Sequence, residues 1–331
     1  MIARLVDAAL ENRIVVLLLV VLLVAVGLYD LKRLPIDTQP DISPRQVLVI
    51  TQAPGLGPLE VERFVTFPVE LALQGLPRME NLRSVTRYGL SVVYVRFADD
   101  MDIYAARNLV FSRLPSVQVP PEAGTPQMGP VSTGLGEIFQ FQVRGKGHGL
   151  MELRSLLDWQ IAPRLRQVPG VIDVNANGGE LKTYEVQVAA DALTRYGLSL
   201  AEIFDAISRN NGARGGATLE RNGEQAVIRG EGLIADPEDI GRIVLRTGEG
   251  GVPLYVRDIA RVTAAARPRL GAVTRDGQGE AVVGVALMLL GENTREVGER
   301  VKAAMGEIGK SLPTGVEIAP YYDRADLINR T

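Results

Sequence analysis

Two residue types that build many catalytic and metal centres are almost missing from this sequence. It contains no cysteine and a single histidine, His148. Without cysteine there is no disulfide bridge, thiolate zinc site or iron–sulfur cluster. With one histidine, an H-E-x-x-H peptidase motif is excluded, and any triad that needs a histidine base would have to use His148. These absences disfavour most hydrolytic and redox enzymes.

The sequence also has no excess of positive charge, and it has few aromatic residues. The 36 basic residues are balanced by 39 acidic ones, for a net charge of −3, and aromatic residues make up 5% of the chain. Nucleic-acid binders carry a basic surplus, and single-strand binders need aromatic stacking platforms. We therefore predict no nucleic-acid partner.

Phosphate-binding and catalytic motifs are not found either. The stretch Gly145–Gly149 reads G-x-G-x-G, but we interpret it as a flexible hairpin rather than a dinucleotide-binding turn. No nucleophile is paired with a base in a recognisable motif. We predict that the chain is not an enzyme and that it has no catalytic residue, no cofactor and no resident metal ligand.

Long hydrophobic runs are absent except for one, Ile14–Tyr29. It is somewhat shorter than the roughly 20 residues that span a bilayer, and the preceding residues extend it as an interfacial turn. Asp7 and Glu11 precede the run and no A-x-A site follows it, which disfavours a cleaved signal peptide. A buried core helix is the other alternative. We predict a transmembrane helix within residues 1–33 and place these side chains in lipid: Ile14, Leu18, Leu22 and Val26.

The rest of the chain alternates strand and helix patterns after a proline-rich connector, Leu34–Pro44. Residues 34–132 predict a β-α-β-β-α series typical of a ferredoxin-like unit. The expected elements are strands at Val47–Thr51, Ser84–Arg87 and Ser91–Phe97, a helix at Leu59–Leu73 that is bent or broken at Pro68, and a helix at Ile103–Leu114.

A second unit repeats this pattern over residues 133–181 plus 276–331, which indicates an internal duplication. The expected elements are strands at Ile138–Val143, Val171–Asn175, Ala281–Leu290 and Val316–Pro320, a helix kinked at Pro163, and a helix at Glu296–Leu312.

An insertion, residues 182–275, interrupts the second unit. Its Gly-rich segment 210–223 is either a mobile loop without a role or an arm that reaches into a neighbouring subunit. The single-residue features have plain interpretations: an exposed bystander for His148, packing for Trp159, and helix capping for Asp99, Asp100 and Asp102.

Many short stretches, in order, resemble one family: the heavy-metal efflux branch of the resistance–nodulation–division (RND) transporters, of which the chain resembles the N-terminal third. The stretches are Leu34–Asp37, Pro40–Ser43, Gln46–Val47, Tyr94–Phe97, Gly129–Pro130, Thr133–Ile138, Leu156–Trp159, Val168–Val171, Tyr196–Ser199, Asn210–Asn211, Arg229–Gly232, Val256–Asp258 and Tyr322–Arg324.

The resemblance implies a membrane-anchored α+β fold with one transmembrane helix and two ferredoxin-like pore subdomains, the second interrupted by a docking subdomain. It implies a proton-driven pump of the bacterial inner membrane with its bulk in the periplasm. The expected partners are two further copies in a homotrimer, a periplasmic adaptor, an outer-membrane channel and the lipid bilayer. The arm that inserts into the next protomer would consist of Asn210, Asn211, Gly212, Arg214, Gly215 and Gly216.

The resemblance also suggests a substrate. The stretch Thr133–Ile138 looks like the branch that exports divalent cobalt, zinc, cadmium or nickel, whereas the copper/silver branch tends to carry tryptophan in place of Glu137. The scattered methionines agree, because soft monovalent ions favour thioether ligands. The alternatives are a copper/silver or multidrug pump and a membrane-tethered docking or assembly module. The family's proton-relay and metal-ligand residues match no position here, so we expect no transport from this chain alone.

Overall fold

The structure is a computed structural model, and it describes residues 12–33, 43–132, 136–212, 214–221, 224–230, 232–248, 250–269 and 271–330. The chain forms two compact units. Unit 1 contains Met1–Arg144, Asp158–Asn177 and Val283–Thr331, and unit 2 contains Gly145–Leu157 and Gly178–Val282. The subdomain boundaries expected from the sequence stay predictions.

The apolar run near the N-terminus forms helix α2, Arg13–Arg33, of 21 residues. Its large side chains from Ile14 to Tyr29 are exposed on every side of the helix. Among the residues that the structure describes, none of the helices combines the length and the hydropathy that crossing a membrane demands. The membrane-spanning role of Ile14, Leu18, Leu22 and Val26 stays a prediction.

The first β-α-β-β-α-β repeat forms a four-stranded sheet with the order β2-β3-β1-β4, in which every pairing is antiparallel. Strands β2 and β3 are joined by the two-residue turn Tyr88–Gly89. The elements are β1 (Gln46–Gln52), α3 (Pro58–Val61), η1 (Glu62–Thr66), α4 (Phe67–Leu73), β2 (Met79–Arg87), β3 (Leu90–Phe97), α5 (Ile103–Arg113), η2 (Leu114–Ser116) and β4 (Gln127–Met128).

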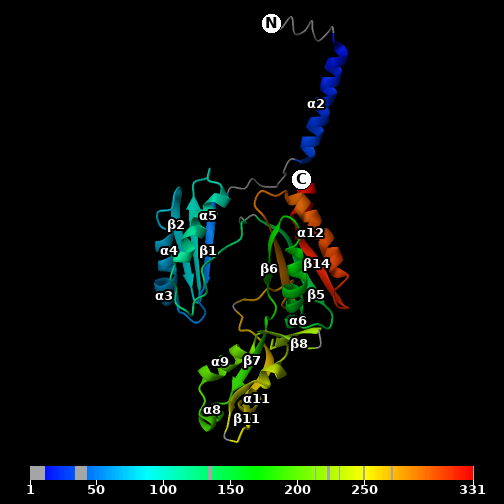
Figure 1. Cartoon of the computed structure of the whole chain (residues 1–331). Coiled ribbons are helices and arrows are strands. Elements are labelled where there is room, and N and C mark those ends of the chain that lie inside the picture. The colour runs from blue at the N-terminus through cyan, green and yellow to red at the C-terminus, as the bar shows by residue number, and fades with distance from the viewer. Residues whose placement is uncertain are drawn as a thin grey trace. The chain divides into compact units, whose positions relative to one another are not determined.

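Alternating side chains decide which face of this sheet is buried. In β1, Val47 and Val49 are buried while their neighbours are half-exposed, as the period of a strand requires. They form one core cluster with Val69 of α4 and Val110 of α5. The two helices therefore cover one face of the sheet, as Figure 1 shows.

The second repeat has the same topology. Its sheet has the order β14-β5-β13-β6, so in both repeats the strands lie in the order fourth, first, third, second. A mixed α/β fold with antiparallel strands is thus confirmed, and the shared strand order agrees with the expected internal duplication. The elements are β5 (Glu137–Gly145), α6 (Leu150–Leu156), η3 (Leu157–Ile161), α7 (Ala162–Leu165), β6 (Val171–Asn177), β13 (Val282–Met288), α12 (Thr294–Gly309), β14 (Val316–Asp323) and α13 (Arg324–Arg330).

Strand β13 is buried along its whole length. A Cβ atom added at Gly284 would lie 2.2 Å from the ring of Phe141, which is itself fully buried. Only glycine fits at this crossing of β5 and β13. The ladder between β13 and β6 is antiparallel and ends at the pair Val283 and Asn177.

Where the sequence predicts helix kinks at Pro68 and Pro163, the structure has a single π-helical turn (a π-turn) just before each proline. The π-helical segments η1 and η3 each end two residues before the proline. Because proline lacks a backbone N–H and clashes with the preceding turn, a wider turn before it relieves the strain. The same device at the same place in both repeats is further evidence of duplication.

The insertion forms two small sheets and a hairpin in unit 2. Its elements are β7 (Lys182–Val188), α8 (Ala190–Tyr196), α9 (Leu200–Asn210), β8 (Arg214–Arg221), β9 (Glu224–Gly230), α10 (Pro237–Gly241), β10 (Val244–Thr247), β11 (Pro253–Tyr255), α11 (Val256–Ile259) and β12 (Ala260–Ala266). Strand β7 pairs antiparallel with β12, and β10 with β11.

Helix α9 begins with a capping box formed by Ser199 and Glu202. The backbone N–H of Ser199 donates to Glu202 Oε2 at 2.7 Å, and the N–H of Glu202 donates to Ser199 Oγ at 3.2 Å. The Ser199 hydroxyl also donates to Glu202 Oε2, at 2.9 Å. The two hydrogen bonds that Ser199 donates to this carboxylate, from its backbone N–H and its hydroxyl, lower the pKa of the Glu202 carboxyl, with a smaller contribution from Arg246.

The interpretation of Gly145–Gly149 as a flexible hairpin is wrong. The G-x-G-x-G stretch Gly145–Gly149 is not a hairpin, because it joins strand β5 to helix α6. The side chains of Leu153 and His148 fill the space beside Gly145, where an added Cβ would come within 2.8 Å of Leu153. The glycine here allows close packing of the turn.

Candidate functional site

The arm predicted at 210–223 contains strand β8. This strand pairs antiparallel with the following strand β9, and the two form a β-hairpin. The first end of the arm is fixed to unit 2 by two amide side chains. Asn210 Nδ2 donates to the carbonyl of Ala206 at 2.8 Å, which closes helix α9. Asn211 Oδ1 accepts from the backbone N–H of Ile234 at 3.3 Å, which ties the start of the arm to the chain that leaves it.

The two ends of the arm also meet through their backbones. The N–H of Gly212 donates to the carbonyl of Gly232 at 3.2 Å. A Cβ atom at Gly232 would lie 2.9 Å from the carbonyl oxygen of Gly212, so the close approach requires glycine. The remaining predicted arm residues belong to β8, where the pairing register shifts after Gly215: Arg214, Gly215 and Gly216.

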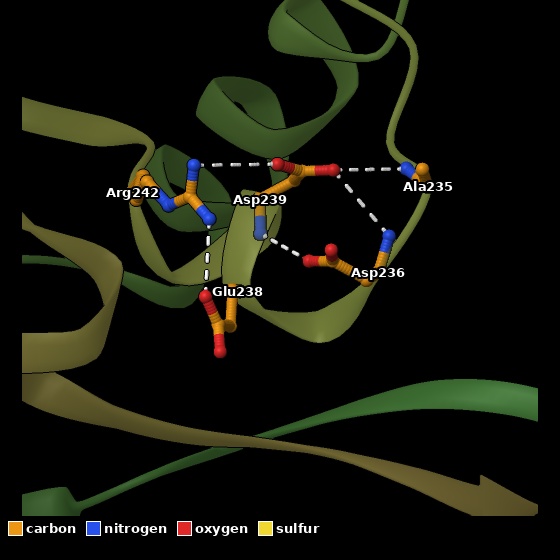
Figure 2. A network of polar contacts seen from close by, with 5 residues as sticks. All are labelled: Ala235, Asp236, Glu238, Asp239 and Arg242. Atoms are coloured by element: carbon orange, nitrogen blue, oxygen red, sulfur yellow. Dashed lines mark hydrogen bonds and ion pairs between the residues drawn. The ribbon is translucent and has the colours of Figure 1, made fainter.

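A polar network holds the chain directly after the arm, as Figure 2 shows. The carboxylate of Asp239 accepts from the backbone N–H groups of Ala235 and Asp236, at 3.1 and 3.4 Å. Asp236 in turn caps helix α10 by accepting from the N–H of Asp239 at 2.9 Å. Arg242 pairs with Glu238 at 3.1 Å and with Asp239 at 3.8 Å. The arm therefore leaves from a fixed base.

The helical layer of the first repeat carries a second candidate surface, which we call the outer apolar face. Helix segments α3, η1 and α4 bury one row of side chains against the sheet and expose another row of large apolar ones. The exposed fraction runs from 47% at Phe64 to 76% at Leu59. Helix α5 exposes Tyr104 and Phe111 in addition. Exposed large apolar side chains that gather on one layer can mark an interaction surface. The face consists of Leu59, Phe64, Phe67, Leu71, Tyr104 and Phe111.

The helical layer of the second repeat differs. The one large apolar side chain that its described helices α6, η3, α7 and α12 expose is Trp159, which is 80% exposed. The packing role expected for Trp159 is therefore wrong. The tryptophan occupies the third position of its π-turn, as Phe64 does in the first repeat.

Of the three aspartates expected to cap helix α5, only Asp102 is shown in that role. Asp102 Oδ1 accepts from the backbone N–H of Ala105 at 2.8 Å. Asp100 pairs with Arg78, and this hydrogen bond lowers the pKa of the Asp100 carboxyl. Both aspartates are thus occupied by structural contacts.

His148 is not exposed as the sequence interpretation assumed. Its side chain is 17% exposed, and Nδ1 lies 2.9 Å from Glu152 Oε1, one turn along the chain. Over the described ranges, no three His, Cys, Asp or Glu residues gather closely enough to hold a metal ion. The surfaces that stand out in the described chain suit assembly rather than chemistry.

Comparison with known proteins identifies the class. The model of the AcrB/AcrD/AcrF family matches residues 5–331, so the chain belongs to this family of RND transporters. This places it among transporters rather than classical enzymes. The resemblance inferred from the sequence is confirmed.

Particular relatives include metal-resistance and cation efflux proteins. The whole chain is 43% identical to Protein HelA of Legionella pneumophila and 40% identical to the cobalt-zinc-cadmium resistance protein CzcA of Cupriavidus metallidurans, and it covers 32% of each. It is 36% identical to the cation efflux system protein CusA of Escherichia coli, again over 32% of that protein. The chain thus spans about a third of the length of these relatives.

A solved structure agrees. A crystal structure of a heavy metal efflux pump superposes with a TM-score of 0.89 at 35% sequence identity, over 98% of this chain and 32% of that one. The similarity therefore extends over both repeats and the insertion.

Proposed function

We propose that this chain is the N-terminal part of a proton-driven bacterial inner-membrane pump that exports divalent heavy-metal cations such as cobalt, zinc, cadmium or nickel. The observation that supports this most is similarity to metal-resistance proteins over the entire chain. Identity is 40% to the cobalt-zinc-cadmium protein CzcA and 36% to CusA. The choice of divalent metals rests on the resemblance of the sequence around Glu137 to the divalent branch.

Helix α2 is the proposed membrane anchor. A helix that is apolar on all sides belongs in a membrane or in the core of a large protein. Large side chains such as Leu18, Leu22 and Val26 are exposed around it. We propose a single pass in this part of the protein, lengthened by the residues before Arg13, with the two repeats and the insertion in the periplasm.

We further propose that the protein assembles as a homotrimer. Two features support this: an arm with a fixed base, which suits insertion into a neighbour, and the outer apolar face, whose exposed large side chains would be covered by a neighbour. The two repeats would be pore subdomains and the insertion a docking subdomain. The remaining partners would be a periplasmic adaptor and an outer-membrane channel.

A chimaera tests the function. This chain would replace the matching third of CzcA in a metal-sensitive bacterium, and growth would be measured in cobalt, zinc and cadmium. The same replacement in CusA would be tested against copper and silver. We expect resistance to the divalent metals to be restored with the CzcA chimaera.

This chain expressed alone is the control, and we expect it to restore nothing. Resistance restored only in the CusA chimaera would contradict a divalent substrate. Failure of both correctly inserted chimaeras, with capture of full-length CzcA by this chain alone, would favour a tethered docking module instead.

A further inference from the structure

A cavity of about 510 Å³ lies in unit 1, in the second repeat. This volume lies within the range of small-molecule sites. Its walls come from strands β5 and β14 and helices α12 and α13. The lining residues that matter here are Phe139, Tyr321, Tyr322, Lys302, Asp326 and Arg330.

Two cationic groups from different helices converge on this cavity. Lys302 of α12 pairs with Asp323 at 2.5 Å, and this hydrogen bond raises the pKa of the Lys302 ammonium, which stays charged. Arg330 of α13 pairs through Nη2 with Asp326 at 2.7 Å. An ammonium has three donors and a guanidinium five, so both retain donors beyond these ion pairs.

The acceptors that line the cavity are more heavily used. One oxygen of Asp323 accepts from Lys302, and the other accepts from the backbone N–H groups of Ala325 and Asp326, at 2.9 and 3.3 Å. The Asp326–Arg330 pair lies at the surface, where such pairs are weak and easily rearranged. The charges of the two cations and the two carboxylates in the lining balance, but the cations keep more unused donors than the carboxylates keep acceptors.

Aromatic groups complete the walls. Phe139 is fully buried, whereas Tyr321 and Tyr322 are 56% and 37% exposed and can be reached from solvent. Burial, aided by the nearby Glu137, raises the pKa of the Tyr321 hydroxyl, so it keeps its proton as a further donor. Aromatic walls with a few polar groups are typical of sites for organic molecules.

We propose that this cavity binds an organic anion: a carboxylate or phosphate group held between Lys302 and Arg330, with an apolar body against the rings of Tyr321, Tyr322 and Phe139. The ligand differs from the cations proposed as pump substrates, so the inference stands apart from the proposed function. Such an anion comes either from a free aromatic acid or from a lipid headgroup.

Fluorine NMR of para-fluorobenzoate added to the full chain in detergent tests the proposal. Para-fluorobenzyl alcohol and para-fluorobenzylammonium have the same ring without the negative charge, and micelles without protein give the blank. We expect the protein to broaden the fluorine signal of the benzoate and not the signals of the alcohol or the ammonium. Binding of the alcohol or the ammonium as strong as that of the benzoate, or no binding at all, would overturn the proposal.

Matched variants locate the site. Arg330→Gln removes a highly exposed guanidinium and should weaken benzoate binding by about tenfold, because a hydrogen bond to a charged group is lost. Arg113→Gln removes an exposed arginine of unit 1 outside the cavity and should leave binding unchanged. Equal effects of the two variants would mean general charge attraction and would refute the cavity as the site.

A competitor identifies the source of the anion. Dihexanoyl phosphatidate carries a lipid headgroup and stays soluble. If it displaces para-fluorobenzoate at lower concentration than unlabelled benzoate does, the site prefers a lipid headgroup. If benzoate competes better, the site prefers free aromatic acids. Both results support an organic-anion site.

Discussion

The two repeats have the same strand order, but the side chains that their helices expose differ in kind. The first repeat exposes six large apolar side chains on its helices, whereas the described helices of the second expose two, Trp159 and Leu327. Both bury a regular row of apolar side chains against their sheets. The inward row specifies the fold, and the outward row is free to diverge. The difference therefore suits different neighbours for the two copies in the proposed assembly.

The largest expected change in stability comes from comparing a buried with an exposed side chain of the same helix. Leu73 and Leu71 both belong to α4, but Leu73 is fully buried and Leu71 is 58% exposed. Leu73→Ala should lower the free energy of unfolding by about 2–5 kcal/mol, and Leu71→Ala should change it by less than about 0.5 kcal/mol. Denaturant titration checks both. Equal losses would show that the outer apolar face is part of the core of the chain.

A glycine pair tests the packing of the second repeat. Gly284→Ala places a methyl group against the ring of Phe141, which is fully buried and has little room to move, and should cost about 1–3 kcal/mol. Gly306→Ala in helix α12 meets no atom within 4 Å and should stabilise by about 0.5–1 kcal/mol. Thermal unfolding should shift in opposite directions. A neutral Gly284→Ala would mean that the second core is loosely packed.

Self-association tests whether the outer apolar face is an interface. The double variant Phe64→Ser and Phe67→Ser should weaken the association constant about tenfold or more, because buried aromatic surface is lost. Trp159→Ser is the matched change in the second repeat and should have a smaller effect. Sedimentation in detergent measures both. If Trp159→Ser has the larger effect, the assignment of the interface to the first repeat is wrong.

The smallest effect concerns the insertion between the halves of the second repeat. The lowered pKa of Glu202 means that its contribution to stability is present above the ordinary pKa of 4.5 and is lost as the pH falls through the lower value in the folded chain. Unit 2 should therefore lose a little stability in this acidic range. In Glu202→Gln, which keeps the cap but does not titrate, this part of the pH dependence should vanish from amide exchange of α9. An unchanged profile would mean that another group causes it.

Much of this fold could be predicted because the inward pattern is periodic. Alternation over Val47–Thr51 and Ser91–Phe97 and helical spacing over Ile103–Leu114 place elements close to those observed. Residue types that favour helix starts stand where helices α9 and α12 begin: the capping box of Ser199 and Glu202, and the N-cap Asn293. The ends of helices and strands are harder to predict. Strand β2 begins at Met79 rather than at Ser84, because apolar and polar side chains alternate poorly in its first half.

The surfaces were harder to predict, because exposure is a property of the assembled layers. Phe64, Phe67 and Trp159 have the sequence appearance of core residues, and only the placement of the opposite row against the sheet shows that they face outward. The cavity beside Lys302 and Arg330 joins residues far apart in the chain. Arg214 opens a strand in a stretch whose glycines predict a loop. No local pattern signals such long-range placements.

The connection between strands β6 and β13 shows how such a protein can acquire new parts. In the first repeat the corresponding strands are joined by the turn Tyr88–Gly89, whereas in the second the whole insertion stands in its place. Asn177 and Val283, at its two ends, are paired across the ladder. Loop closure costs grow only slowly with length, so a hairpin tip can be exchanged for a domain with little penalty to the sheet. The repeat is thus a scaffold on which evolution can graft, enlarge or exchange an accessory module without redesigning the host fold.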